Sequence, residues 1–138
     1  MKKIVKRACA GMFAALMAVS AMSVPSSATS VSGSVGGNNC GGSNNITSTG
    51  ASARTYADSS MTLVVELHYF YDVYGIPQPI IEEKITSNAN NPVTSIYTSA
   101  NKPSGNTRSN HCYSTHRAVY SFAGNSYSWE ATTADQDF

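Results

Sequence analysis

Charged residues are scarce in this chain of 138 residues, and the basic ones are concentrated at its start. Only 12% of the residues are charged, and no cluster of Lys or Arg follows Arg7. Clustered positive charge is what draws a protein to nucleic acid or to an anionic lipid surface. The composition therefore argues against a general affinity for nucleic acid or for anionic lipid.

Long apolar runs are also missing after residue 28, so the sequence predicts no membrane span in the mature chain. The one apolar stretch, residues 8–22, is shorter than the roughly 20 residues that a span needs. It follows a Lys/Arg-rich start and precedes Ser26-Ser27-Ala28, a small-x-Ala cleavage site. These features predict a secretory signal peptide over residues 1–28 and a secreted, extracellular protein that begins near Thr29. The lysine-rich start is typical of a bacterial signal.

Cysteine is rare, and only two of the three cysteines remain after cleavage, because Cys9 lies inside the predicted signal. Cys40 and Cys112 are then an even pair in an oxidising compartment, which favours a disulfide between them. Such a bond closes a loop of about 70 residues and contributes roughly 4 kcal/mol by the chain-entropy estimate. Cleavage also removes four of the nine basic residues, which leaves five against eight acidic residues and a formal charge of −3.

Helical patterns are absent as well, since no segment after the signal shows an apolar stripe at helical spacing or a capping box. The expected fold is therefore all-β, a small antiparallel β-sandwich or barrel of five to seven strands. Residues 29–50 are mainly Ser, Gly, Asn and Thr. They are predicted to form a flexible leader, because such a composition buries little apolar area. The single all-β domain is predicted to span residues 51–138.

The clearest strand signal is the segment from Met61 to Tyr74. Its odd positions are all apolar or aromatic, whereas its even positions include Glu66, His68 and Asp72. This period of two predicts a long strand whose odd side chains lie on the core. Because strands of this length are uncommon, a break or bulge near its middle is compatible with the pattern.

Two shorter strands are predicted next, over residues 80–86 and 93–98. A cluster of Asn and Pro turn formers separates them. Glu82 and Glu83 indicate that the first of the two lies at a solvent-facing edge.

A hairpin is predicted near the end of the chain, from residues 115–122 and 126–133 around a turn at Gly124-Asn125. A two-residue turn there would pair Phe122 with Tyr127, which makes one face aromatic and the other mostly polar.

The outer face of the long strand carries the most suggestive candidate site. We call its residues the outer stripe: Glu66, His68, Phe70, Asp72 and Tyr74. Two aromatic rings among charged neighbours, if no second layer covers them, are typical of a surface that binds sugars or another protein. The alternative is that a loop covers this face, or that Phe70 turns inward past a bulge.

Soft metal ligands are few, and they form one cluster in sequence. His111, Cys112 and His116 could bind zinc with Cys40, or Cys112 could act as a nucleophile with His116 or His68 as its base. The spacing departs from the C-x2-C and H-x3-H patterns, and the local signatures of a catalytic cysteine are missing. The sequence therefore predicts no metal site and no cofactor.

Paired carboxylates are the remaining catalytic option, because glycoside hydrolysis needs two of them on opposite sides of a sugar cleft. The acidic residues of the domain include Glu66, Asp72, Glu82, Glu83 and Glu130. The pattern places them on exposed faces, where carboxylates are normally solvated surface charges. The sequence leans against an enzyme.

These features favour a secreted, non-catalytic β-module that binds a glycan or a protein at a cell surface or in the medium. A secreted antimicrobial, bacteriocin-like or toxin-like protein is an alternative of a different class, which the small size and the signal fit equally well. A small hydrolase is the weakest alternative, because no catalytic motif supports it. An assembly role is also open, since the nearly uncharged leader could add strands between molecules.

Overall fold

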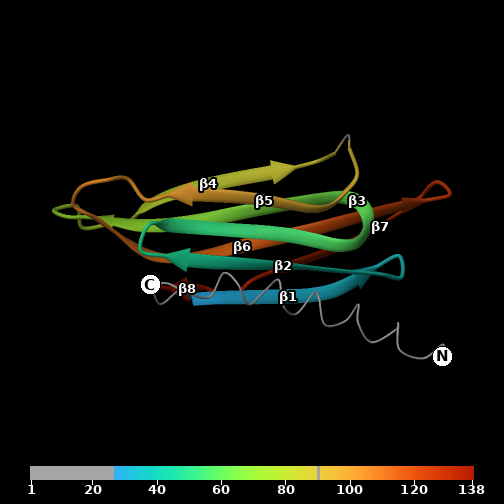
Figure 1. The fold of residues 1–138 in the computed structure, drawn as a ribbon, viewed down its shortest axis with the longest axis horizontal. Coiled ribbons are helices and arrows are strands. Elements are labelled where there is room, and N and C mark those ends of the chain that lie inside the picture. The colour runs from blue at the N-terminus through green and yellow to red at the C-terminus, as the bar shows by residue number, and fades with distance from the viewer. Residues whose placement is uncertain (1–26, 90) are drawn as a thin grey trace, which may run out of the picture.

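The computed structural model describes residues 27–89 and 91–138, and this part of the chain is all-β (Figure 1). Eight antiparallel strands form one sheet, which confirms the predicted fold class but exceeds the expected five to seven strands. The strands are β1 (Ser27–Val35), β2 (Asn38–Thr47), β3 (Gly50–Val73), β4 (Ile80–Ser87), β5 (Val93–Asn101), β6 (Thr107–Phe122), β7 (Asn125–Thr132) and β8 (Gln136–Asp137).

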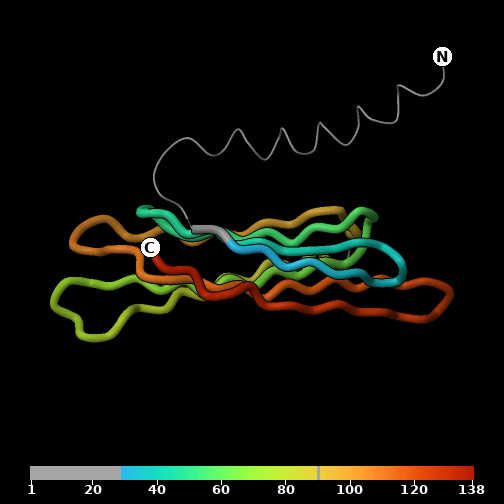
Figure 2. The backbone as a smooth tube through the Cα atoms, turned by 90° about the horizontal axis from the view of Figure 1, so that it is seen from below, coloured from blue at the N-terminus to red at the C-terminus, as the bar shows by residue number. Residues whose placement is uncertain are grey.

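The sheet curls into a half-barrel, so that its two halves face each other as two layers (Figure 2). Strand β3 runs through both layers, and its register with β5 shifts between Tyr56 and Met61. Its first half pairs with β2 and β5, and β1 pairs with β2. Its second half pairs with β4 and β6, and β6 continues to β7 and β8. We call these halves the first layer and the second layer.

The core between the layers is built on the alternation of β3. The odd side chains from Met61 to Tyr69 are buried, as the period of two predicts, and four of them are completely so. These four are Leu63, Val65, Leu67 and Tyr69. Burying an aliphatic or aromatic side chain of this size contributes about 1.5–3 kcal/mol. The second half of β3 is therefore the apolar centre of the molecule.

Residues 29–50, expected as a flexible leader, instead lie in β1 and β2 as paired strands of the first layer. The turn between them has φ of 56° at Gly36 and 79° at Gly37, values that suit a tight two-residue hairpin turn. Glycines of these strands lie where ring side chains of the second layer pack against the backbone. A Cβ on Gly33 would lie 2.1 Å from Trp129 Nε1, and one on Gly42 would lie 2.0 Å from His116 Cγ. The local composition does not indicate these strands, because the rings that pack on them lie about 75–95 residues later in the sequence.

The predicted disulfide between Cys40 and Cys112 is not formed, and both side chains are buried free thiols. Cys40 packs in one cluster with Val35 and Leu63, whereas Cys112 packs in another with Ile46 and Tyr69. Burial, with a smaller effect of Asp58, raises the pKa of Cys40. The expectation failed because the two cysteines fill different parts of the core rather than facing each other.

The shorter predicted strands are confirmed as β4 and β5, and β4 lies at an edge of the second layer. The hairpin of β6 and β7 is also present, with its turn at Ala123-Gly124 rather than Gly124-Asn125. Tyr120 therefore pairs with Tyr127, a register two residues from the predicted one. A shift of two leaves every side chain on its predicted face.

Residues 1–26 of the predicted signal peptide lie outside the described residues, and β1 begins at Ser27. In residues 27–89 and 91–138, no helix has the length and apolar character required to cross a membrane.

Candidate functional site

The outer stripe lies on the solvent side of the second layer, away from the first layer. Even residues of β3 face outward there because the odd residues fill the core. The register places His68 between Glu83 of β4 and Tyr113 of β6, and Phe70 between Ile81 and His111. No described element packs over this face (Figure 2).

Stacked rings cross from β3 to β6 on this face. The rings of His68 and Tyr113 have centroids 4.5 Å apart and planes inclined by 14°, and those of Phe70 and His111 lie 4.0 Å apart at 19°. A third contact, Phe70 to Tyr113 at 6.1 Å, joins the two pairs. Each ring therefore has one face stacked on a neighbouring ring, and the stacks join the two strands across this face.

Two carboxylates hold the imidazole of His68 from both sides. Its Nε2 lies 3.0 Å from Glu66 Oε1, and its Nδ1 lies 3.3 Å from Glu83 Oε1. A neutral imidazole has one N–H and can donate to only one of these oxygens, whereas the charged ring can donate to both. The His68 side chain is 15% exposed, against 36% for Glu66 and 60% for Glu83. The carboxylates are thus more accessible than the ring between them.

A bulge in β6 shapes the end of the stripe. The register between β3 and β6 changes after Phe70, and Asn110 is the extra residue on β6. Asp72 accepts hydrogen bonds from Arg108 Nε at 2.9 Å and from Asn110 Nδ2 at 3.0 Å. Bulges often re-aim side chains near binding sites. Here the bulge directs Arg108 and Asn110 to the same carboxylate.

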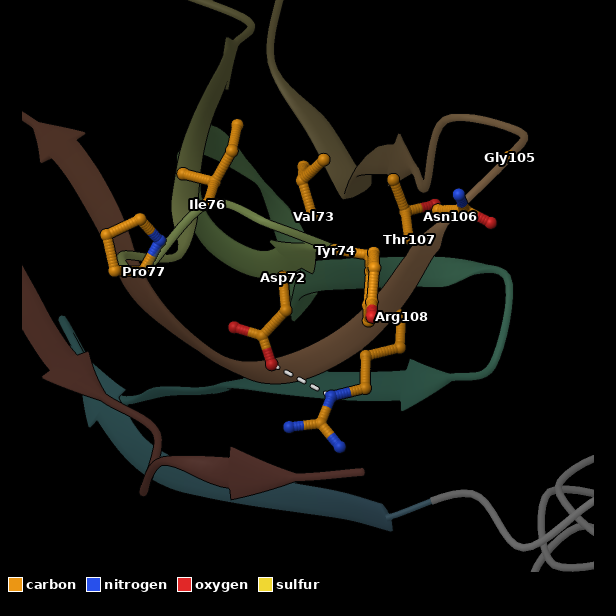
Figure 3. A pocket seen from close by; sticks show the side chains of 9 residues that line it. All are labelled: Asp72, Val73, Tyr74, Ile76, Pro77, Gly105, Asn106, Thr107 and Arg108. Atoms are coloured by element: carbon orange, nitrogen blue, oxygen red, sulfur yellow. Dashed lines mark hydrogen bonds and ion pairs between the residues drawn. The ribbon is translucent and has the colours of Figure 1, made fainter.

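A hollow of about 700 Å³ continues from Asp72 at this end of the layer (Figure 3). It lies between the loop after β3 and the loop before β6, and its lining combines the Asp72–Arg108 pair with apolar side chains. Tyr74 is 88% exposed and Ile76 is 48% exposed, so both apolar groups are accessible. Tyr74 is tied to the facing loop by its backbone N–H, which donates to the Asn106 carbonyl at 2.8 Å.

The structure therefore brings four residues of the outer stripe together and places the fifth, Tyr74, in the adjoining hollow. We define the outer patch as Glu66, His68, Phe70 and Asp72 together with Glu83, His111 and Tyr113. Phe70 faces outward, and the alternative in which it turns inward is wrong.

Glu83, His111 and Tyr113 were missed as members of this site because they come from neighbouring strands. The alternation of β6 could have placed His111 and Tyr113 on one face, but only the pairing register shows which residues of β3 they meet.

A second cluster of polar groups is sealed between the layers. His116 Nδ1 lies 2.8 Å from Thr55 Oγ1, whose hydroxyl donates to the Val64 carbonyl at 2.9 Å. Ser114 Oγ lies 2.7 Å from His116 Nε2, and Thr133 lies 3.1 Å beyond. These contacts fit a neutral ring that donates from Nδ1 and accepts at Nε2. Burial lowers the pKa of His116 to about 4.

The hydroxyl–imidazole chain resembles a catalytic arrangement, but His116 and Ser114 are completely buried, so no substrate can reach them. Burial, with a smaller effect of Asp135, raises the pKa of Cys112 to about 12, which opposes a reactive thiolate. His111 faces outward while Cys112 and His116 face the core, so the three cannot converge on one ion. Within the described ranges, no group of three or more His, Cys, Asp or Glu residues could hold a metal.

Comparison with known proteins adds no relative. The sequence matches no known protein family, and neither curated proteins nor solved structures show a significant similarity to it.

Proposed function

We propose that this protein is a secreted, non-catalytic binding module, and that its outer patch and the adjoining hollow bind an extracellular protein. The observation that carries the proposal is the uncovered layer face on which His68, held between two carboxylates, stacks on Tyr113. A recognition surface needs side chains that are ordered before the partner arrives, because ordering them on binding costs affinity.

The chemistry of the outer patch favours a partner with a basic group. Glu66 and Glu83 are the accessible charges beside His68, whereas the charge of Asp72 is already balanced by Arg108. A Lys or Arg of the partner would therefore meet the two glutamates. Charge complementarity of this kind fixes orientation and increases the rate of association.

The hollow favours a large apolar side chain on the same partner. It is bordered by Tyr74, Ile76 and Pro77, which are accessible and apolar. His68 and Asp72 are four residues apart on one strand, a separation of about 13 Å. A basic group and an apolar anchor spaced by roughly this distance would occupy the outer patch and the hollow together.

A protein partner fits this face better than a glycan. Sugars bind aromatic side chains mainly through exposed ring faces, whereas one face each of His68, Phe70 and Tyr113 is already stacked on another ring. What remains accessible is carboxylate oxygen, ring edge and the apolar surface of Ile81 and Ile85, which are 57% and 65% exposed. This mixture is typical of protein interfaces.

A displayed random-peptide library, selected on the purified protein, tests this proposal. We expect enriched peptides that combine Lys or Arg with a large apolar residue. Binding should weaken about tenfold or more with Glu66→Lys, which reverses one charge of the outer patch, and with Tyr74→Ser, which removes an apolar wall of the hollow. Tyr97→Ser is the matched control, because Tyr97 is 59% exposed on the first layer.

Peptides that bind all three variants as tightly as the unchanged protein would rule out this face as the binding site. A glycan array probed with the same variants decides the ligand class. Glycan binding that is lost with Glu66→Lys and kept with Tyr97→Ser would replace the protein partner by a sugar.

A further inference from the structure

Strand β4 ends the second layer with an open edge. It pairs with β3 alone among the described strands, and it lies along the rim of the molecule in Figure 1. Ile81 and Ile85 are largely exposed on its outer side. An edge strand with apolar side chains is a template for pairing with another strand, and proteins normally protect such an edge.

The sequence of β4 is self-complementary about Glu83. If two copies pair antiparallel with Glu83 opposite itself, Ile81 faces Ile85 of the second copy, and Glu82 faces Lys84 of the second copy. Each of these pairs occurs twice by symmetry. Both apolar pairs lie on the outer side, and both ion pairs lie on the inner side, as the alternation of a strand requires.

The neighbouring registers lack this match. A change of register by one residue would place outer side chains of one copy opposite inner side chains of the other. The alternative registers to compare are therefore those that differ by two residues. Centring the pair on Glu82 places Ile81 opposite Glu83 and Glu82 opposite itself, and centring it on Lys84 places Glu83 opposite Ile85. Each of these two registers places an isoleucine opposite a glutamate and a charged residue opposite itself. The register centred on Glu83 instead pairs isoleucine with isoleucine and glutamate with lysine.

We propose that two copies of this protein associate through their β4 edges, in the register centred on Glu83, to form one continuous sheet with a two-fold axis. The occupant of the edge is a second copy because the complementary residues are those of β4 itself. The inference goes beyond the proposed function, since it concerns pairing of the β4 edge with a second copy, although Ile81, Glu83 and Ile85 also belong to the face that contains the outer patch. The pairing places two outer patches side by side on the same face of the joined sheet.

Glu83 opposite itself is the one unfavourable pair in this register. Two carboxylates facing each other across strands repel. In each copy, however, Glu83 already lies 3.3 Å from His68 Nδ1, and its side chain is 60% exposed, so it can turn away from its symmetry mate. The repulsion predicts that Glu83→Gln strengthens association about threefold.

Disulfide trapping tests the register directly. A residue opposite itself across an antiparallel pair has Cα atoms about 4.5–5.5 Å apart, within the range that a disulfide spans. Glu83→Cys should therefore form a covalent dimer under mild oxidation. Ser99→Cys, at an exposed position of the edge strand β5 in the first layer, is the matched control and should remain monomeric. The natural thiols Cys40 and Cys112 are buried and should not interfere.

Charge exchange tests the ion pairs in solution. Sedimentation over about 10 µM to 1 mM covers the affinity expected for an interface built on one strand pair. Glu82→Lys alone should weaken association about tenfold, because it opposes like charges twice. Combining it with Lys84→Glu should restore association to within about threefold of the unchanged protein, since the ion pairs return with reversed polarity. Circular dichroism of each variant establishes that it is folded.

Three results would overturn the proposal. These are a protein that stays monomeric up to about 1 mM, a Glu83→Cys variant that cross-links no faster than Ser99→Cys, and a double exchange as weak as Glu82→Lys alone. None of them would bear on peptide binding by the outer patch, so this proposal and the proposed function can fail separately.

Discussion

The imidazole of His116 shows how one side chain can couple acidity to stability. It is completely buried among uncharged groups, with Thr55 and Ser114 as its hydrogen-bond partners. Folding holds the ring neutral and lowers its pKa from 6.5 to about 4. Between these values the unfolded chain binds a proton that the folded protein does not bind, so the free energy of unfolding falls as the pH falls.

The expected loss is about 3 kcal/mol between pH 6.5 and pH 4, with little further loss below pH 4 from this group. His116→Gln should remove this part of the pH dependence, because the amide can still hydrogen bond but does not titrate. His111→Gln, on the outer face, is the control. Denaturant unfolding at pH 7 and pH 4.5 measures the effect, and an equal pH dependence in all three proteins would show that His116 is not responsible.

Among the elements, β4, β5, β7 and parts of β3 and β6 could be predicted from sequence, whereas β1 and β2 could not. From Met61 to Tyr69 an unbroken alternation marks β3, because each buried side chain is itself apolar. In β1 and β2 the buried positions include Gly42 and Asn44, whose partners are a ring and a backbone carbonyl from β6. Local periodicity detects a strand that carries its own apolar side chains and misses one that receives them from elsewhere.

Local periodicity also predicts part of the candidate site. Parity along one strand placed Glu66, His68 and Phe70 on the outer face, and the structure agrees. The neighbours that complete the outer patch depend on strand pairing, which no local pattern encodes. The bulge at Asn110 adds a further difficulty, because it reverses the parity of β6 and brings Arg108 to Asp72.

The close packing of Gly33 in β1 against Trp129 in β7 predicts an energetic coupling between these two strands. Gly33→Ala should destabilise the protein by about 1–3 kcal/mol, because its Cβ would overlap the indole of Trp129. In a Trp129→Ala background the same change should cost little, which gives a coupling energy in a double-mutant cycle. Thermal or denaturant unfolding of the four proteins measures it. Additive effects of the two substitutions would contradict the direct contact.

At the scale of the whole molecule, folding requires the first layer as well as the second. Strands β1 and β2 cover His116, Tyr120 and Trp129, which would otherwise be exposed to water. The division into a flexible leader and a domain starting at residue 51 therefore differs from the arrangement in the structure.

A chain that begins at residue 51 should consequently fail to fold, whereas one that begins at Thr29 should fold. Far-ultraviolet circular dichroism and the dispersion of amide NMR signals distinguish the two outcomes. If the shorter chain gave a dispersed spectrum and a cooperative transition, residues 29–50 would be dispensable for the fold.

The dependence of β1 and β2 on rings from residues 116–129 also sets an order in time. The ribosome makes the glycine-rich strands before the rings that pack on them, which lie about 75–95 residues later in the sequence. Pairings between distant parts of a chain form slowly, because closing a long loop costs conformational entropy before the new contacts stabilise the fold. Strands β1 and β2 therefore lack the rings that pack on them until residues 116–129 have been synthesised. In the secreted protein that we propose, the first layer would then be completed after export.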